Sequence, residues 1–365
     1  MRTSFQSSLC FIVAITVAAS HSQLSAADVY GLTPGPVELQ SAGPMAFGPS
    51  NVLFVGDPKA AKVYAINTED SGKADGGYEI TDIQANLAKA LGGKDVTVVD
   101  MAVNPETGHA FVSVNSGGKG RLARIAPDGT VTPLNLDKIG HATATLPNPP
   151  EDKVVDSGRR RSNPREQSIT DLAYTEGKVL VAGLQAGDSP SSVREFDFPF
   201  RDRSEGMRVE IFHAAHGRSE DYAAIQTFVP FNIGGEPSLL AGYTCTPLVK
   251  IPVDKLGSTE KITGTTVAEL GNRNRPLDMI VYKRDGKDYL LMANSARGVM
   301  KISTDDLETN SGLKERVSGG GTAGQPYETI ESLTGIVQLD KVDDEHALVM
   351  AENDGALSLK TIHLP

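Results

Sequence analysis

A short pattern of apolar stretches recurs along this chain, and it limits the possible folds more than any other feature. The clearest copy runs from Leu277 to Ile302 as an apolar stretch, a polar turn, a second apolar stretch, a short loop and a third stretch. The first stretches of the copies begin near Met45, Asp100, Asp171, Thr227, Asp278 and Gly335. By subtraction, successive starts lie 55, 71, 56, 51 and 57 residues apart. Such a period is the mark of a repeat architecture, in which each unit packs against its neighbours.

Each copy predicts one small antiparallel sheet. The middle stretch is continuously apolar, as in Leu290–Ala293, which is typical of a strand buried on both faces. The third stretch, as in Val299–Ile302, has apolar residues at its ends and a charged residue between them. A fourth, more exposed strand is expected at Gly77–Ile80, Thr130–Leu134, Arg208–Phe212, Thr266–Leu270 and Glu315–Val317.

The sixth copy ends the sequence without a fourth strand. An unassigned strand, Pro36–Gln40, precedes the first copy. Donating this strand to the last sheet would close a ring and remove the open sheet edges that promote aggregation. The 37 Gly and 21 Pro residues also favour a turn-rich chain. The sequence therefore predicts an all-β fold: a six-bladed β-propeller of four-stranded antiparallel blades, closed by an N-terminal strand.

Two segments carry a resemblance to known propellers. Pro276–Val281 and Leu333–Val337 are comparable to the start of the inner strands in NHL and SMP-30-type (TolB-like) six-bladed propellers, which typically begins with Pro, any residue, Gly and then apolar residues. In most copies of this chain Asp replaces the Gly. The resemblance covers residues 36 to 365 and implies a six-bladed propeller, but it implies no specific activity.

The N-terminal residues have the pattern of an export signal. Arg2 is followed by the apolar stretch Leu9–Ala19 and by the small residues Ser25–Ala27. We expect residues 1–27 to be a cleaved signal peptide, which predicts a periplasmic or secreted protein. No apolar stretch reaches the roughly 20 residues that a membrane-spanning helix needs. Residues 28–365 are expected to form one propeller domain, and Cys245 is its only cysteine.

Two segments depart from the repeat. Residues Ile83–Leu91 have helical spacing and predict a short helix after the first copy. Residues 140–167 form a long insertion that is rich in proline and arginine. A loop of this length in a compact domain is usually functional or disordered.

The loops expected on one face of the propeller are basic, although the chain has 46 acidic and 35 Lys or Arg residues and a net charge of -11. That charge argues against nucleic-acid binding. A cationic rim would suit an anionic small molecule or an acidic protein partner, bound by a chain that we expect to be monomeric. The alternative is that the arginines pair with Asp100, Asp171, Asp221 and Asp278. The candidate ligand-binding residues are Arg161, Arg165, His213, His216, Arg218, Arg273, Arg275, Asn294 and Arg297.

Two groups of residues in the sequence are candidates for metal binding, one of aspartates and one of histidines. Asp100, Asp171 and Asp278 occupy equivalent positions near the expected channel mouth. They would either bind Ca²⁺, which takes oxygen ligands, or accept hydrogen bonds from backbone N–H groups of the next blade. His213 and His216 are three residues apart, and a metal there would need a further ligand that the sequence does not mark.

Two classes of function fit these features. The first is an exported binding module that holds an anionic molecule or a protein partner on its channel face. The second is an enzyme on that face, either a metal-dependent, lactonase-like hydrolase or a quinone-dependent dehydrogenase. No cofactor is assigned by the sequence; Ca²⁺ or another divalent metal is one candidate. The catalytic residues and the ligand are left open.

Overall fold

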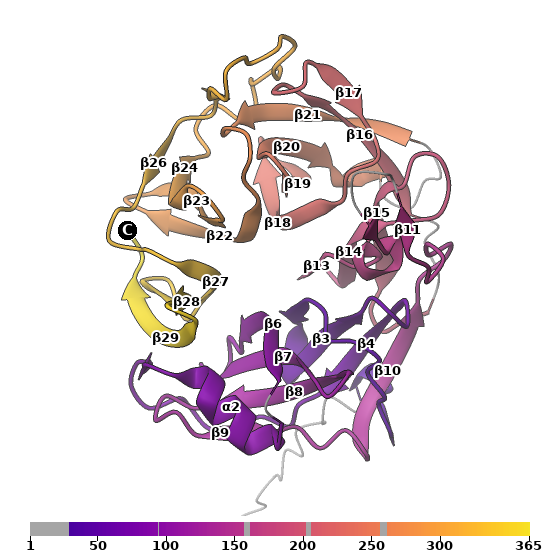
Figure 1. Ribbon diagram of the computed structural model, residues 1–365, viewed down its shortest axis with the longest axis vertical. Helices are drawn as coiled ribbons and strands as arrows, with labels where there is room; N and C mark the ends of the chain where they lie inside the picture. The colour runs from indigo at the N-terminus through magenta and orange to yellow at the C-terminus, as the bar shows by residue number, and fades with distance from the viewer. Residues whose placement is uncertain (1–28, 94, 157–160, 202–205, 256–260) are drawn as a thin grey trace, which may run out of the picture.

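Strands make up most of the structure and are arranged around a central axis, as in a β-propeller (Figure 1). This computed structural model describes residues 29–365 except 94, 157–160, 202–205 and 256–260. The expected signal peptide, residues 1–27, lies outside the described residues. Among the helices of the described residues, none is long and apolar enough to cross a membrane. The predicted all-β propeller fold is confirmed.

Four sheets of the ring are single blades. The first has the strand order β1-β10-β4-β3-β2. Its strands are β1 (Thr33–Gly35), β2 (Met45–Phe47), β3 (Val52–Asp57), β4 (Lys62–Asn67) and β10 (Ile139–Thr145). The second consists of β6 (Val96–Val103), β7 (Ala110–Ser116), β8 (Lys119–Ile125) and β9 (Val131–Pro133). The third consists of β22 (Pro276–Arg284), β23 (Lys287–Asn294), β24 (Gly298–Ser303) and β26 (Tyr327–Thr329). The fourth consists of β27 (Ile336–Lys341), β28 (His346–Asn353), β29 (Ala356–His363) and β5 (Glu79–Ile80).

The rest of the ring is one ten-stranded sheet. Two four-stranded meanders are joined at their outer strands, because β16 and β21 pair in parallel from Arg208↔Lys261 to Ile211↔Gly264. The strands are β13 (Asp171–Thr175), β14 (Lys178–Leu184), β15 (Ser191–Asp197), β16 (Met207–His213), β17 (Arg218–Glu220), β18 (Ile225–Ile233), β19 (Glu236–Tyr243), β20 (Pro247–Pro252), β21 (Lys261–Glu269) and β25 (Ala323–Gly324). The prediction of six separate blades is therefore wrong: four blades are separate, and two meanders share one sheet.

Short elements complete the described structure. The predicted helix is confirmed as α2 (Ile83–Leu91). The Asp82 side chain accepts a hydrogen bond from Ala85 N at its start, and Gly92 ends it with a φ of 69°, a conformation that glycine adopts without a steric penalty. The 140–167 insertion contributes β10, the hairpin of β11 (Val155–Asp156) and β12 (Arg161–Ser162), and η2 (Pro164–Gln167). The other two 3-10 helices are η1 (Pro49–Asn51) and η3 (Val253–Lys255).

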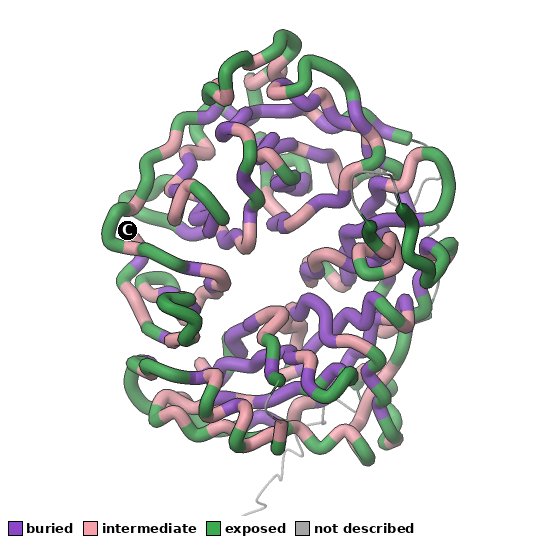
Figure 2. The backbone as a smooth tube through the Cα atoms, in the orientation of Figure 1, coloured by how far each residue is buried: buried purple, intermediate pink, exposed green. Residues whose placement is uncertain are grey.

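The hydrophobic core is divided among the interfaces between neighbouring sheets. Each of six buried clusters joins residues from two meanders, such as Phe54 with Leu172 and Val112 with Leu348. Figure 2 shows that burial concentrates in the inner and middle strands and exposure at the rim. Because every middle strand is covered on both faces, the continuous apolar stretches of the sequence are explained.

These interfaces give the order of the inner strands around the axis, which is β2, β13, β18, β22, β27, β6 and back to β2. The blade of β6 thus lies between the first and the last blades. The chain passes from the first blade to the second, returns through β10 to the edge of the first, and then runs through the remaining meanders (Figure 1).

The prediction that Pro36–Gln40 closes the ring is wrong. β1 pairs with β10 at the edge of the first blade, and residues 36–40 form no strand. The last blade is instead completed by β5, where Ile80 pairs with Leu359 and Glu79 with Lys360. The segment expected as the fourth strand of the first blade therefore covers the last one. β10, from the insertion, takes its place beside β4. The expected strand at Glu315–Val317 is also absent from the described structure, and β26 fills that position.

Candidate functional site

Three aspartates from the predicted site tie neighbouring inner strands together. Each carboxylate accepts a hydrogen bond from a backbone N–H of the next inner strand around the axis. The bonds run from Met45 N to Asp100 Oδ2 at 2.6 Å, from Phe228 N to Asp171 Oδ2 at 2.7 Å and from Leu339 N to Asp278 Oδ2 at 2.8 Å. The sequence left two roles open for these aspartates, Ca²⁺ binding and acceptance of hydrogen bonds from backbone N–H groups. These three contacts match the second role.

A fourth aspartate was missed by the sequence analysis. Asp340 on β27 accepts from Val103 N on β6 at 2.7 Å and from Lys341 N at 2.7 Å. It lies two residues further along its strand than the position equivalent to Asp278, which Gln338 occupies. Because Asp340 does not stand at the position where Asp recurs in the repeat, the repeat gave no signal for it. The available clue was an Asp directly after the apolar residue Leu339 of a predicted inner strand.

The four aspartates line a cavity of about 330 Å³ on the axis of the ring, together with backbone and apolar side chains of the inner strands. Desolvation by the surrounding protein raises the pKa of Asp171 to about 7 and that of Asp340 to about 6. Desolvation, and then repulsion from the other carboxylates, raises the pKa of Asp100 and of Asp278 well above the usual range. Each of the four aspartate residues is half-buried.

These shifts predict a pH dependence of stability. Because the folded state holds the Asp171 proton up to about pH 7 and the unfolded chain releases it near pH 4, protonation favours folding between these values. Compared with Asp171→Asn, the native chain should gain about 1–2 kcal/mol of unfolding free energy between pH 7.5 and 5.5. Urea denaturation of both proteins at the two pH values measures this. A native chain that loses stability relative to the variant on acidification would contradict it.

A second, larger cavity of about 800 Å³ lies at one end of the same axis, and we call it the mouth cavity. Val99, Thr170 and Leu277 line it, and each directly precedes one of the inner-strand aspartates. The remaining lining residues come from the inner strands, from the loops between blades and from the insertion. They include Arg161, Asn163, Glu166, Gln167, Gln226, Thr244, Arg275 and Gln338.

Only part of the predicted basic rim meets at the mouth cavity. Arg161 from β12 and Arg275 from the loop before β22 both line it and are exposed. Arg165, which is close in sequence, instead donates to Pro150 O at 2.6 Å and to Lys59 O at 3.1 Å. It therefore holds the insertion against the first blade. The sequence predicted that Arg165 binds a ligand, whereas its side chain bonds backbone carbonyl groups of Pro150 and Lys59.

The other residues predicted near β22 have separate positions. Arg273 lines a cavity of about 380 Å³ together with Arg316. Arg297 packs over Gly271, where a Cβ atom would collide with the guanidinium group. Asn294 is buried, and its Oδ1 accepts from Ala296 N and Arg297 N, which fixes the turn after β23.

The expected pairs between arginines and the inner-strand aspartates are not formed among the described residues. The ion pairs of the described chain include no contact of Asp100, Asp171 or Asp278 with an arginine. Asp221 is instead bonded to Lys261 at 2.7 Å and to Ser189. For the described residues this interpretation is wrong, because the carboxylates of Asp100, Asp171 and Asp278 accept from backbone N–H groups of neighbouring inner strands.

His213, His216 and Arg218 do not reach the axis. They lie on β16, on β17 and in the turn between these strands, at the outer rim of the ten-stranded sheet (Figure 1). The sequence placed this turn on a loop that enters an inner strand. Instead, the turn leads into β17, a further strand that pairs with β16 at the rim. The loop that enters the inner strand β18 begins only after Glu220.

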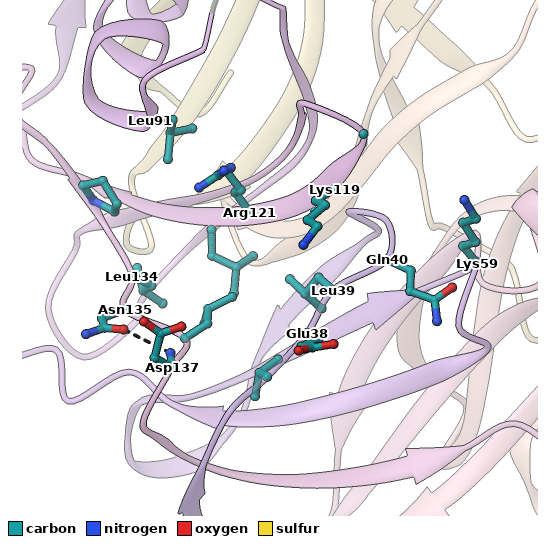
Figure 3. A pocket seen from close by; sticks show the side chains of 16 residues that line it. Glu38, Leu39, Gln40, Lys59, Leu91, Lys119, Arg121, Leu134, Asn135 and Asp137 are labelled. Carbon is teal, nitrogen blue, oxygen red and sulfur yellow. Dashed lines mark hydrogen bonds between the residues drawn. The ribbon is translucent and has the colours of Figure 1, made fainter.

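A separate groove of about 550 Å³ lies between β8 and the segment before β2 (Figure 3). Lys119 and Arg121 line it opposite Glu38 and Asp137, and leucines form its floor. None of the residues predicted from sequence lies in this groove. Its lining has charged groups of both signs.

No protein-family model matches the sequence, and no curated protein matches it. Solved structures with a similar arrangement include the extracellular domains 1–2 of Drosophila Semaphorin 1b, with 10% identity, 91% of this chain and 88% of that chain covered, and a TM-score of 0.38. The PQQ-bound aldose sugar dehydrogenase from Streptomyces coelicolor has 9% identity, covers 91% and 96%, and has a TM-score of 0.30. The full extracellular region of Plexin A4 has 8% identity, covers 91% and 51%, and has a TM-score of 0.41. No function is inferred from similarity this distant, and the fold is assigned from the arrangement of the strands.

Proposed function

We propose that this chain is an exported binding module that holds a small, polar anion in the mouth cavity. The observation that carries the proposal is the convergence of Arg161 and Arg275 on one cavity of about 800 Å³. Within the described residues, neither guanidinium group has an ion-pair partner. One carboxylate, that of Glu166, also lines the cavity, so the charged side chains of the described lining have a net positive charge, which favours an anionic ligand.

The rest of the lining narrows the class of ligand. The amides of Gln167 and Gln226 and the hydroxyl group of Thr244 line the cavity, and Gln338 has a buried Oε1 without a partner among the described residues. The Asn163 amide is already bonded to Asp152 and to two backbone N–H groups. This set suits a ligand that carries hydroxyl groups beside its carboxylate, such as a sugar acid. The cavity volume falls in the range of about 300–1,000 Å³ that small-molecule sites occupy.

The aspartates beneath the mouth cavity support the walls of the site. Because Asp171 and Asp278 bond to the backbone of the next inner strand, they fix the spacing of the strands that carry Thr170 and Leu277. Their raised pKa values also leave part of this group uncharged near neutral pH, which reduces repulsion of an anion. Export is proposed from the pattern of residues 1–27 alone.

Isothermal titration with glucuronate and with glucose tests the proposal, since these probes differ mainly in the carboxylate. We expect glucuronate to bind the native chain saturably and glucose to bind much more weakly. Loss of a charged hydrogen-bonding partner in Arg275→Ala should weaken glucuronate binding about tenfold or more. Arg161→Ala should have a similar effect.

Arg218→Ala is the matched control, because it removes an exposed arginine at the outer rim. It should leave glucuronate binding unchanged. Equal losses in the Arg218 and Arg275 variants would show a general charge effect and overturn the proposed site. Absence of saturable binding by glucuronate and by citrate would also overturn it, and would favour a protein partner on this face.

A further inference from the structure

The turn between β16 and β17 gathers three metal-ligating side chains at the outer rim. β16 ends at His213, the chain turns through Ala214–Gly217, and β17 ends at Glu220. Gly217 N donates to His213 O at 2.8 Å, so the turn is tight and brings His216 back over the strand. Thr266 Oγ1 donates to Phe212 O at 2.6 Å and fastens the end of β16 to β21.

The ligand atoms of these side chains face one another. His213 Nδ1 lies 2.9 Å from Glu220 Oε2, and His216 Nδ1 lies 2.7 Å from Glu220 Oε1. The two imidazole rings have their centroids 3.9 Å apart. The three candidate ligand atoms all lie within 4.8 Å of one another. Zinc–nitrogen and zinc–oxygen bonds of about 2 Å need ligand atoms at this kind of separation.

The cluster is built into the fold on one side and open on the other. His213 and Glu220 are each only 4% exposed, whereas the His216 side chain is 44% exposed. Two buried ligands give a fixed platform, and the exposed third ligand leaves room for water or another small ligand at the remaining coordination position.

The Glu220 carboxylate is held in place by its neighbours. Its Oε2 contacts His213 Nδ1, and its Oε1 contacts His216 Nδ1 and accepts from Arg218 Nε at 3.0 Å. Glu269, buried beneath the turn, accepts a hydrogen bond from Ala215 N at 3.0 Å and holds the turn against β21.

We propose that His213, His216 and Glu220 bind one divalent transition-metal ion of the zinc class. Two imidazole nitrogens and one carboxylate form a donor set that favours Zn²⁺, Ni²⁺ or Cu²⁺ over Ca²⁺ or Mg²⁺, which take oxygen ligands. Arg218 Nε now bonds Glu220 Oε1 at 3.0 Å, and its exposed guanidinium group would swing away when the ion binds. This site lies apart from the mouth cavity and is independent of the function proposed there.

Bound metal would stabilise the rim where the two meanders join. β16 carries His213 and also forms the parallel pairing with β21 that unites the ten-stranded sheet. An ion that links the end of β16 to the end of β17 would therefore resist separation of this hairpin from the sheet. Binding to the folded state alone raises the melting temperature with metal concentration.

Titration of the EDTA-treated full chain with ZnCl₂, followed by calorimetry and thermal unfolding, tests the proposal. We expect one ion per chain and a rise in melting temperature that CaCl₂ does not give. Since loss of even an outer-shell partner costs about 10–100-fold in affinity, His216→Ala should weaken Zn²⁺ binding by about 100-fold or more. Arg218→Gln should bind Zn²⁺ more tightly, because a competing cation is removed.

His363→Ala is the matched control. The rings of His363 and His346 lie with their centroids 4.4 Å apart, and His346 contacts Asp343, so the chain offers a second pair of histidines beside a carboxylate. This variant should bind Zn²⁺ like the native chain. Unchanged binding in His216→Ala, or loss of binding in His363→Ala, would overturn the proposal.

If the His216→Ala variant does not fold, the visible absorption spectrum of Co²⁺ bound to the native chain still tests the proposal. Co²⁺ added to the native chain should give the intense visible bands of a four-coordinate site. A spectrum with only the weak bands of the hydrated ion would overturn the proposal.

Discussion

Replacing Tyr78 by alanine is expected to lower the free energy of unfolding by about 4 kcal/mol. Tyr78 directly precedes β5, the strand that completes the last blade, and its side chain is 3% exposed. Its hydroxyl group donates toward Gly108 O and Ile125 O and accepts from Ala110 N at 2.8 Å. The residue thus fastens the closing strand to the blade of β6.

Its backbone also binds the last blade. Tyr78 N donates to Thr361 Oγ1 at 2.8 Å, and Thr361 N donates to Tyr78 O at 3.0 Å. The alanine variant would lose the buried ring and leave the partners of its hydroxyl group unsatisfied. Since β29, the last strand of the sequence, pairs with β5 at this point, loosening it should open the ring.

Urea denaturation of the native chain and of two further variants measures this effect. Tyr78→Phe keeps the ring and loses only the hydroxyl contacts, so it should cost about 2 kcal/mol. Tyr222→Ala, at an exposed tyrosine, should change stability by less than about 1 kcal/mol. A Tyr78→Ala protein as stable as the native chain would show that β5 does not close the ring in solution.

Replacing Asp278 by alanine is expected to cost about 3 kcal/mol, the second largest effect. Its Oδ2 accepts from Leu339 N at 2.8 Å and its Oδ1 from Met279 N at 2.7 Å. Alanine would leave both N–H groups without this acceptor at the centre of the ring. The cost exceeds that of an ordinary surface ion pair because two backbone donors are left unsatisfied together.

Asp288→Ala on the neighbouring strand β23 is the matched control. Its carboxylate lies 3.7 Å from Lys283 Nζ at the surface, an ion pair worth about 1 kcal/mol or less. Chemical denaturation should separate the two variants clearly. Equal, small losses for Asp278→Ala and Asp288→Ala would show that the inner-strand aspartates do not hold neighbouring strands together.

The sequence predicted many residues of the candidate sites, but it did not predict which of these residues lie together. Asp100, Asp171 and Asp278 were identified because they recur at equivalent positions of the repeat, and all three lie on the central axis. Asp340 escaped because it breaks that equivalence. Arg161 and Arg275 meet at the mouth cavity although they are far apart in sequence, and no local pattern predicted which arginines would meet there.

By itself the sequence determined the elements that depend on local contacts. Helix α2 follows from its apolar spacing and its terminal Asp82 and Gly92. The inner and middle strands follow from apolar stretches that must be buried on both faces, and these contacts repeat in every meander.

Only the tertiary structure decided how the edges are paired. A short outer strand such as β5 offers the same backbone donors and acceptors to any open edge, so its sequence does not name its partner. Packing between distant segments assigned β5 to the last blade, β10 to the first and β16 to β21. The same long-range packing set the order of the blades, placed His213 and His216 at the outer rim, and brought Arg161 and Arg275 to the same cavity.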